Sequence, residues 1–418
     1  MRRIRWTKWA FLVWLCLLGL GGCGDESADD DSGAEGGDDD ALPADDDAGA
    51  DDDTSDGDDD TPGNPLLNPE EPGPYLVGNR SYFFTDATRE LSCGDGKRVL
   101  LTEVWYPAAD NAMDYPENYL EDFFLGRIDE VREALGEQAG DMNNLPTGSY
   151  RGAPLHPDAG KLPVLFFSHG FMSNRFQNFT MADYLASHGY IVVAPDHICN
   201  SVVTLTPTAV VLGTPLSMIT TLPERIADMS FLMDVFEQQP PELFAGHIDT
   251  ARFAIWGHSF GGLTATEVAK REPRVKALLQ LASFGFPFVP DTVTAPSMYF
   301  WGKQDKVMRM FKAFHYQLIA KMPPPKMELE FFNTGHFAFS DLCDFVGTLG
   351  AHGNGCGTET RIGGDGTFTN PDHDKLHGVL DPYATAFFGA ALYGLAPLEE
   401  YLAENHFPGM MEYQVTTH

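Results

Sequence analysis

The clearest indication of the fold is a short stretch at residues 256–262, which has the sequence WGHSFGG. A mostly apolar run, residues 252–255, precedes it, and a helical pattern at residues 263–270 follows it. The glycines on both sides of Ser259 fit the pattern G-x-S-x-G, in which a sharp turn between a strand and a helix exposes the serine. The absence of a side chain at these glycines lets the strand and the helix approach closely. The stretch therefore predicts a strained turn with a nucleophilic Ser259, although an ordinary Gly/Ser turn would have the same pattern.

Short apolar runs alternate with helical segments on both sides of this turn. Strands that are apolar throughout are typical of parallel sheets covered by helices. The sequence therefore predicts an α/β domain with a mostly parallel sheet, helices on both faces and inserted loops. The strands are expected at residues 75–84, 99–106, 163–168, 190–194, 253–256, 275–281, 297–301 and 327–332, and the helices at 120–135, 177–188, 222–236 and 382–393.

The N-terminus has the pattern of an export signal. Basic residues within 1–8 are followed by the apolar run 9–20, which is short for a membrane span. The next residues, LGGC at 20–23, resemble a bacterial lipobox, in which the cysteine is acylated and becomes the first residue of the mature chain. We therefore expect residues 1–22 to be a lipoprotein signal peptide and Cys23 to carry a lipid anchor in the cell envelope. An ordinary signal peptide with an incidental cysteine is the alternative.

The segment that follows is strongly acidic. The chain has 418 residues and a formal net charge of −34, and 19 of its 61 acidic residues lie between residues 25 and 60. Such a segment cannot bury enough apolar surface to fold, and its like charges repel. The sequence predicts an acidic disordered tether at residues 23–72 and a folded domain at residues 73–418. Because this domain is acidic as well, nucleic acid is not expected as a partner.

The cysteines of the predicted domain suggest disulfide bonds. Four of the six cysteines lie there, and an even number in an exported protein is typical of disulfide pairing. Cys343 and Cys356 bracket a glycine-rich loop and are the first expected pair. Cys93 and Cys199 would then pair by exclusion.

Three residues in the order Ser259, Asp305, His336 could form a catalytic triad. A serine that attacks a carbonyl group needs a base to take its proton and an acid to orient that base. Asp305 follows the predicted strand 297–301 and His336 follows the predicted strand 327–332, so both belong to the edge where sites form in parallel sheets. A capping aspartate and an ordinary loop histidine are the plainer interpretations. The order along the chain favours the triad.

Two backbone N–H groups are predicted to stabilise a negatively charged oxygen. The predicted strand 163–168 ends in the sequence SHGF at residues 168–171. In sites of this type, the loop after that strand supplies one donor and the residue after the nucleophile supplies the other. We expect these donors to be the N–H groups of Phe171 and Phe260. His258 is expected to point away from the substrate and to pack or hydrogen-bond.

Several motifs together resemble the platelet-activating-factor acetylhydrolase branch of the α/β-hydrolases, near the dienelactone-hydrolase-like esterases. The resemblance spans residues 72–405 and implies metal-free hydrolysis of carboxylic esters, including short or oxidised acyl groups on phospholipids, with Ser259 as nucleophile and His336 as base. In that family the acid follows the strand after the elbow helix, where this chain has the acid-free stretch 279–284. Asp305 matches the commoner α/β-hydrolase arrangement instead. The motifs are VWYPA at 104–108, FSHGF at 167–171, APDH at 194–197, GHSFGG at 257–262, and GH at 335–336 with FSD at 339–341.

Residues 201–221 are unusually apolar for a loop. One interpretation is a lid or a wall of an acyl pocket, and the other is ordinary core beneath the insertion at residues 108–160. Four phenylalanines could likewise line a pocket or belong to the core: Phe171, Phe284, Phe286 and Phe288. The apolar residues of the loop are Val202, Val203, Leu205, Val210, Val211, Leu212, Met218 and Ile219.

The sequence as a whole predicts a membrane-tethered serine esterase that forms an acyl-enzyme and acts on small-molecule or lipid esters. Two alternatives stay open: a broad lipase or polyester hydrolase with the same triad, and a catalytically silent surface binding protein on this fold. No cofactor and no metal site are expected. The group His352, Asp372, His373 and Asp374 lies in a Gly/Asp-rich insertion and is predicted to be a surface loop.

Overall fold

The computed structural model describes residues 68–136, 143–214, 218–286, 292–345 and 354–417. The predicted signal peptide, the lipobox cysteine Cys23 and most of the predicted tether lie outside the described residues, as do Phe288 and His352. Residues 69 and 70 already contact the domain. The Tyr184 hydroxyl donates to the Pro69 carbonyl (2.8 Å), and the Tyr401 hydroxyl donates to the Glu70 carboxylate (3.0 Å).

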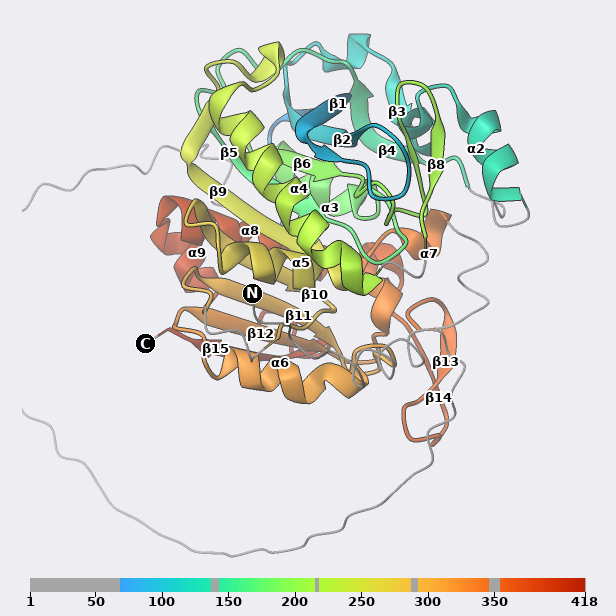
Figure 1. Ribbon diagram of the computed structural model, residues 1–418. Coiled ribbons are helices and arrows are strands. Elements are labelled where there is room, and N and C mark those ends of the chain that lie inside the picture. Colours follow the sequence, from blue (N-terminus) through green and yellow to red (C-terminus); the bar gives the residue numbers. More distant parts are fainter. Residues whose placement is uncertain (1–67, 137–142, 215–217, 287–291, 346–353, 418) are drawn as a thin grey trace, which may run out of the picture. The chain divides into compact units, whose positions relative to one another are not determined.

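An eleven-stranded mixed sheet runs through the domain (Figure 1). The six neighbouring strands from β12 to β6 are parallel, as predicted. Antiparallel strands extend the sheet on both sides, with β15 beside β12 and β2 beside β6. In order across the sheet the strands are β15 (Met411–Thr416), β12 (Lys326–Phe331), β11 (Ser297–Gly302), β10 (Val275–Leu281), β9 (Ile248–His258), β5 (Leu162–Ser168), β6 (Ile191–Pro195), β2 (Lys97–Ala108), β1 (Leu76–Glu90), β4 (Pro146–Arg151) and β3 (Glu117–Tyr119).

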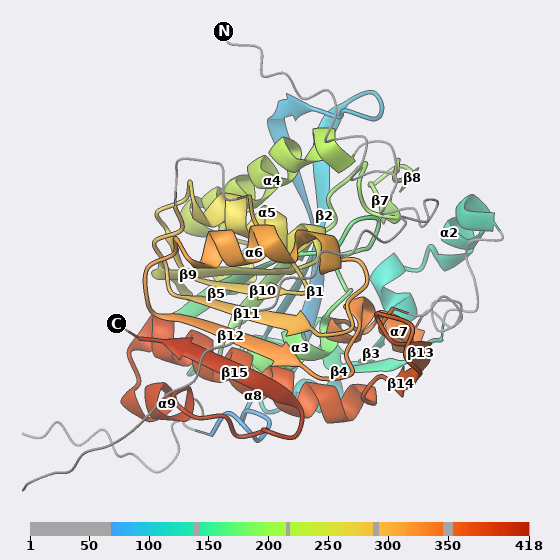
Figure 2. The same ribbon diagram turned by 90° about the horizontal axis from the view of Figure 1, so that it is seen from below.

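Helices cover both faces of this sheet (Figure 2). Helices α4 (Met218–Gln238), α5 (Phe260–Ala269) and α6 (Lys312–Ile319) lie on one face, and α3 (Phe179–Ser187), α8 (His373–Tyr393) and α9 (Ala396–Tyr401) lie on the other. Successive side chains of a strand point to opposite faces, so β5 contributes to both layers. Val164 and Phe166 join the cluster under α4 and α5, while Leu165 and Phe167 join the cluster under α3 and α8. Two hydrophobic cores therefore hold the strands in place.

Two predicted segments differ from the structure. The helix expected at residues 120–135 is divided into a 3₁₀ helix, Leu120–Phe124, and α2 (Ile128–Leu135), because Leu125 and Gly126 adopt positive φ angles of 55° and 74°. The prediction of a surface loop at residues 372–374 is wrong as well. Asp372 is the N-cap of α8, and His373 and Asp374 form its first turn, so this helix begins nine residues before the predicted start at residue 382.

The first part of the apolar stretch at residues 201–221 contains a small hairpin of β7 (Val203–Leu205) and β8 (Val210–Leu212), and residues 218–221 begin α4. Val203 and Leu205 are buried in the core with Phe123, which agrees with the core interpretation for the first strand. Leu212 is 42% exposed, so the second strand is only partly covered. The side chains of Met218 and Ile219 are outside the described part of the chain.

Two disulfide bonds tie loops to the domain. Both predicted pairs, Cys93–Cys199 and Cys343–Cys356, are confirmed. The second pair links α7 (Leu342–Phe345) to the segment before β13 (Thr358–Thr360), which forms a hairpin with β14 (Thr367–Thr369). Disulfides are typical of exported proteins. Among the described helices, none combines the length and the apolar character needed to cross a bilayer.

Candidate active site

Ser259 occupies the sharp turn between β9 and α5. Its backbone has φ 55° and ψ −122°, a strained conformation for a residue with a side chain. The flanking glycines are required by close packing. A Cβ atom on Gly261 would lie 1.8 Å from the Ser168 carbonyl oxygen, and one on Gly257 would lie 2.5 Å from the Gly261 backbone. The turn therefore holds the serine at the end of the strand, in the conformation that the glycine pattern indicated.

The structure brings Ser259, His336 and Asp305 together in one hydrogen-bonded row. The Ser259 hydroxyl lies 2.9 Å from His336 Nε2, and His336 Nδ1 lies 2.7 Å from Asp305 Oδ2. Asp305 follows β11, and His336 begins the 3₁₀ helix His336–Phe339 that follows β12. His336 and Asp305 are 3% and 2% exposed, whereas Ser259 is partly exposed. A serine with this access and these neighbours can transfer its proton to an imidazole as it attacks a carbonyl group.

The two carboxylate oxygens of Asp305 have different partners. Oδ1 accepts hydrogen bonds from the N–H groups of Val307 (2.9 Å) and Met308 (2.8 Å), so Asp305 does cap the turn that follows it. Oδ2 accepts a hydrogen bond from the Nδ1–H group of His336. The capping bonds fix the carboxylate so that its second oxygen faces the imidazole. Asp305 therefore caps the turn with one carboxylate oxygen and bonds the imidazole of His336 with the other.

His258 links the loop after β5 to the backbone of His336. The Gly170 N–H donates to Gln177 Oε1 (2.7 Å), Gln177 Nε2 donates to His258 Nδ1 (2.6 Å), and His258 Nε2 donates to the His336 carbonyl (3.0 Å). Burial, with the neighbouring His336, lowers the pKa of His258 to about 3. The ring is therefore neutral and can accept at Nδ1 while it donates at Nε2. Gln177, which the sequence did not indicate, completes this connection.

The predicted oxyanion donors lie on neighbouring segments. Phe260 is the first residue of α5, where backbone N–H groups lack an acceptor within the helix. Phe171 follows Gly170 in the loop after β5, and its ring meets the Phe260 ring edge to face with centroids 6.3 Å apart. A Cβ atom on Gly170 would lie 3.2 Å from Gln177 Oε1 and 3.4 Å from His258 Nδ1. The small residue thus leaves room for the network that holds this loop.

A second serine, histidine and aspartate are joined behind this loop, but they are fully buried. Ser168 Oγ lies 3.0 Å from His197 Nε2, and His197 Nδ1 lies 2.9 Å from Asp228 Oδ2. All three residues are 0% exposed, so no ester can reach this serine. Burial, together with the charge of Arg225, lowers the pKa of His197 to about 3 and keeps the ring neutral. The arrangement holds the end of β5 in place.

Arg225 connects this buried network to the Ser259 turn. Its guanidinium donates to Ser168 Oγ (3.2 Å), to Asn200 Oδ1 (3.1 Å) and to the His169 carbonyl. The same group lies 4.6 Å from the centre of the Phe260 ring. Arg225 therefore touches both segments that carry the predicted oxyanion donors. Its sequence signal is modest: a charged pair, Arg225 and Asp228, three residues apart in an expected helix.

Phe284 lies near the nucleophile and is part of an aromatic cluster. Its neighbour Ser283 donates to the Ser259 carbonyl (2.6 Å). The Phe284 ring stacks on Phe311 with centroids 4.2 Å apart and meets Phe286 edge to face at 5.5 Å. Phe284 is buried, so it belongs to the core beside the site.

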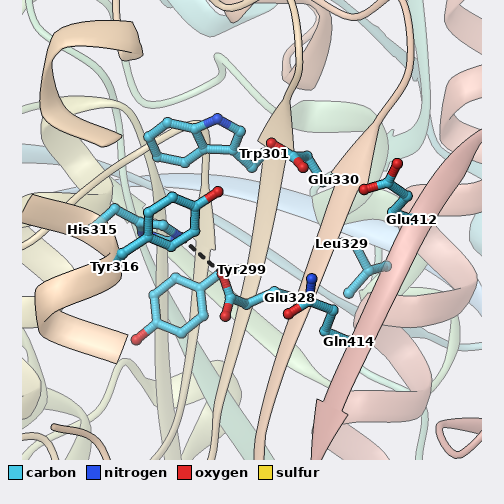
Figure 3. Close-up of a pocket in the computed structure, with 9 residues that line it drawn as sticks. All are labelled: Tyr299, Trp301, His315, Tyr316, Glu328, Leu329, Glu330, Glu412 and Gln414. Carbon is cyan, nitrogen blue, oxygen red and sulfur yellow. Dashed lines mark ion pairs between the residues drawn. The ribbon is translucent and has the colours of Figure 1, made fainter. Parts of the chain in front are cut away.

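A separate pocket lies on β11, β12 and β15 beside α6 (Figure 3). The His315 ring stacks on Trp301 at 4.5 Å and pairs with the Glu328 carboxylate at 3.3 Å. None of the pocket's residues belongs to the row around Ser259, so the pocket is distinct from the candidate triad. It is lined by Tyr299, Trp301, His315, Tyr316, Glu328, Leu329, Glu330, Glu412 and Gln414.

Known proteins resemble this chain in sequence and in fold. The family described as "Platelet-activating factor acetylhydrolase, isoform II" matches residues 65–209, and the family described as "PET hydrolase-like" matches residues 154–350. A platelet-activating factor acetylhydrolase of Cavia porcellus is 26% identical over 263 residues, which span 53% of this chain and 57% of that protein. The solved structure of a ferulic acid esterase from Streptomyces cinnamoneus has a TM-score of 0.59 at 21% identity, covering 77% of this chain and 91% of that one.

The sheet, its two helical layers and the strand–turn–helix at Ser259 form an α/β-hydrolase fold, which the ferulic acid esterase structure shares. Parts of the chain are similar to the platelet-activating-factor acetylhydrolases and to PET hydrolase-like proteins, in agreement with the resemblance that the motifs predicted.

Proposed function

We propose that the chain is a carboxylic ester hydrolase in which Ser259 is the nucleophile. The observation that carries this proposal is the row of hydrogen bonds from Ser259 through His336 to Asp305, with distances of 2.9 and 2.7 Å. The related acetylhydrolase and esterase families support the same reaction type.

The reaction would proceed through an acyl-enzyme. His336 Nε2 takes the proton as Ser259 Oγ attacks the ester carbonyl, and the N–H groups of Phe171 and Phe260 donate to the negatively charged oxygen. His336 then gives the proton to the departing alcohol. Water attacks the acyl-enzyme by the same route and releases the carboxylic acid. Asp305 keeps the imidazole in the orientation and tautomer that these transfers need.

The proposed substrates are short-acyl esters, including esters of phospholipids. The match to an acetylhydrolase family over residues 65–209 favours a small acyl group. The match to a PET hydrolase-like family over residues 154–350 favours a second candidate, a broader lipase or polyester hydrolase with the same triad. A series of p-nitrophenyl esters of increasing chain length separates the two. A steep fall in kcat/KM beyond short acyl groups supports the first, and a flat profile supports the second.

The substitution Ser259→Ala tests the reaction itself. We expect it to lower kcat on p-nitrophenyl acetate by about 10⁴-fold or more, because loss of the nucleophile removes the acyl-enzyme route. Labelling by a fluorophosphonate probe should disappear as well. The buried Ser168 provides a matched control, since Ser168→Ala should leave the labelling in place. A wild-type protein that neither turns over esters nor reacts with the probe would instead be a silent binding protein.

We further propose that residues 1–22 are a signal peptide, that Cys23 carries the lipid anchor, and that the acidic segment between Cys23 and the first residues that contact the domain separates the domain from the membrane. The LGGC sequence at residues 20–23 and the two disulfides support an exported, anchored protein. Cys23→Ser tests the anchor in a bacterial host. The wild-type chain should sediment with membranes, and the variant should not. Equal sedimentation of both would contradict the proposal.

A further inference from the structure

Two histidines of α8 and one aspartate bring three metal-ligating atoms together. His373 and His377 are four residues apart in the first part of the helix, so both face the same side. Asp341 precedes α7 and lies five residues beyond His336. His373 Nε2 is 2.7 Å and His377 Nε2 is 3.7 Å from Asp341 Oδ1, and the three ligand atoms all lie within 4.8 Å of one another.

The decisive atom is Nε2 of His377. The residue is 4% exposed, and its Nδ1 lies 3.0 Å from both carboxylate oxygens of Asp381, so Nδ1 carries the proton. Nε2 is buried and has no hydrogen-bond partner among the described residues. A buried polar atom without a partner is costly and rare. In the neutral ring this atom presents a lone pair towards the Asp341 carboxylate. A cation between the two would satisfy both.

Each histidine also has a carboxylate behind it. Asp381 lies at Nδ1 of His377, and Asp344 Oδ2 lies 3.4 Å from Nδ1 of His373. Histidines that bind metals usually donate their second N–H to a carboxylate, which fixes the tautomer and raises the basicity of the ligand atom. The same arrangement at both rings leaves Nε2 of each as the ligand atom, directed at Asp341.

We propose that Asp341, His373 and His377 bind a divalent transition-metal ion, and that this ion is zinc. Two imidazoles and one carboxylate suit zinc better than calcium or magnesium, which prefer oxygen ligands. A water molecule would complete a tetrahedral site. None of the three ligands belongs to the row around Ser259, so the proposal stands independently of the proposed hydrolase activity.

The ion would join three parts of the domain. The Thr180 N–H at the start of α3 donates to the second oxygen of Asp341 (3.0 Å), and the Asp341 N–H donates to the Gln177 carbonyl (3.0 Å). Binding at Asp341 therefore ties α8 to the segment that follows His336 and to the start of α3. Bound there, the ion would stabilise the folded domain where these segments meet.

Zinc binding can be measured on the mature, untagged full-length chain. The protein is stripped with a chelator and titrated with Zn²⁺ in millimolar Mg²⁺, which occupies the acid-rich N-terminal segment. We expect one zinc ion per chain by elemental analysis and a higher melting temperature with zinc than without. Co²⁺ in its place should give visible absorption bands of a four- or five-coordinate ion. A stripped protein that takes up no zinc and does not change its melting temperature would overturn the proposal.

Variants locate the site. His373→Ala, at a partly exposed position, should weaken zinc binding by more than 100-fold, and Asp381→Asn should weaken it by about 10- to 100-fold because it acts through His377. His247→Ala, a histidine outside the cluster, is the matched control and should bind zinc as the wild type does. Circular dichroism checks that each variant is folded. If His373→Ala and Asp381→Asn bind zinc as tightly as the control, the site is elsewhere and the proposal is wrong.

Discussion

Asp305 shows how one side chain serves local structure and the candidate site at once. The substitution Asp305→Asn separates these uses, because the amide oxygen can still accept the N–H groups of Val307 and Met308 while the amide nitrogen faces His336. The amide nitrogen of the substituted side chain would donate a hydrogen bond to His336 Nδ1, so the imidazole would carry its proton on Nε2. A protonated Nε2 cannot accept the proton of Ser259. We expect kcat to fall by about 10⁴-fold, with little change in stability, as measured by ester turnover and thermal unfolding.

A control at Asp249 tests whether that loss is specific. Asp249 pairs with Arg252 within β9, and Asp249→Asn should leave kcat close to that of the wild type. If Asp305→Asn keeps near-normal turnover, another residue orients His336 and the proposed triad is wrong.

The sequence predicted the three residues of the hydrogen-bonded row, but it did not predict the residues that hold their neighbouring segments in place. Ser259, Asp305 and His336 each follow a strand that the sequence predicted, so their local pattern predicted that they lie at one edge of the sheet. Gln177 and Arg225 have no such local signal. Gln177 meets His258 across 81 residues of sequence, and Arg225 meets Ser168 across 57. Contacts of that separation exist only once the sheet has assembled.

At the scale of elements, the loop after β5 and the segment of His336 are held in one network by Gln177. We expect Gln177→Leu to lower kcat by up to about 10²-fold, because the Gly170 and His258 partners shift when their hydrogen bonds are lost. The free energy of unfolding should fall by about 1–3 kcal/mol, since a buried N–H is left without an acceptor. Steady-state kinetics and urea unfolding measure the two effects.

Gln238→Leu, at an exposed position in α4, is the matched control for that change and should alter neither quantity. A Gln177→Leu protein with wild-type kcat would show that the network does not position the candidate site.

The predictions of individual elements succeeded and failed for physical reasons. Most of the six parallel strands were evident because both of their faces are buried and their sequences are mostly apolar, as in β5, β6 and β11, whereas β12 alternates between buried and partly exposed residues. Strand β15 was missed because its residues alternate between polar and apolar at the sheet edge, and β3 because it has only three residues. The helix expected at residues 120–135 was wrong since its apolar spacing continues across Leu125 and Gly126, where the backbone turns to positive φ.

At the scale of the whole molecule, buried histidines make stability depend on pH. Burial lowers the pKa of His169, His197 and His258, so the folded state keeps them neutral while the unfolded state binds protons below about 6.5. Stability is therefore full above that pH and falls as the pH decreases, by up to about 1.4 kcal/mol per pH unit for each histidine. We expect urea unfolding at pH 5 to show a lower free energy than at pH 6.

Two other histidines, His373 and His377, affect the pH dependence of stability in the opposite direction. His373 has a pKa raised to about 9, mainly by the Asp341 carboxylate against the opposing effect of burial, and the pKa of His377 is also raised. In the metal-free protein the contribution of His373 is present below pH 6.5 and is lost as the pH rises towards 9, and the contribution of His377 is likewise lost as the pH rises above 6.5. A free energy of unfolding that is equal at pH 5 and pH 6 would contradict the assignment of three neutral buried histidines.

The Cys343–Cys356 bond reaches the candidate site through the backbone. Cys356 follows Asn354 and Gly355, and the Asn354 carbonyl accepts the N–H of Phe337, directly after His336. A Cβ atom on Gly335 would lie 2.5 Å from the Gly355 nitrogen, so these two segments are in tight contact. In a reducing cytoplasm the Cys343–Cys356 bond would not form. The segment of Asn354 would then be held less firmly against the segment that carries His336. The proposed hydrolase would then be inactive while it is synthesised, and oxidation after the proposed export would switch on an activity that would otherwise act on the esters of its own host. Turnover by the reduced and the oxidised protein, compared at equal folded fraction, measures that latency.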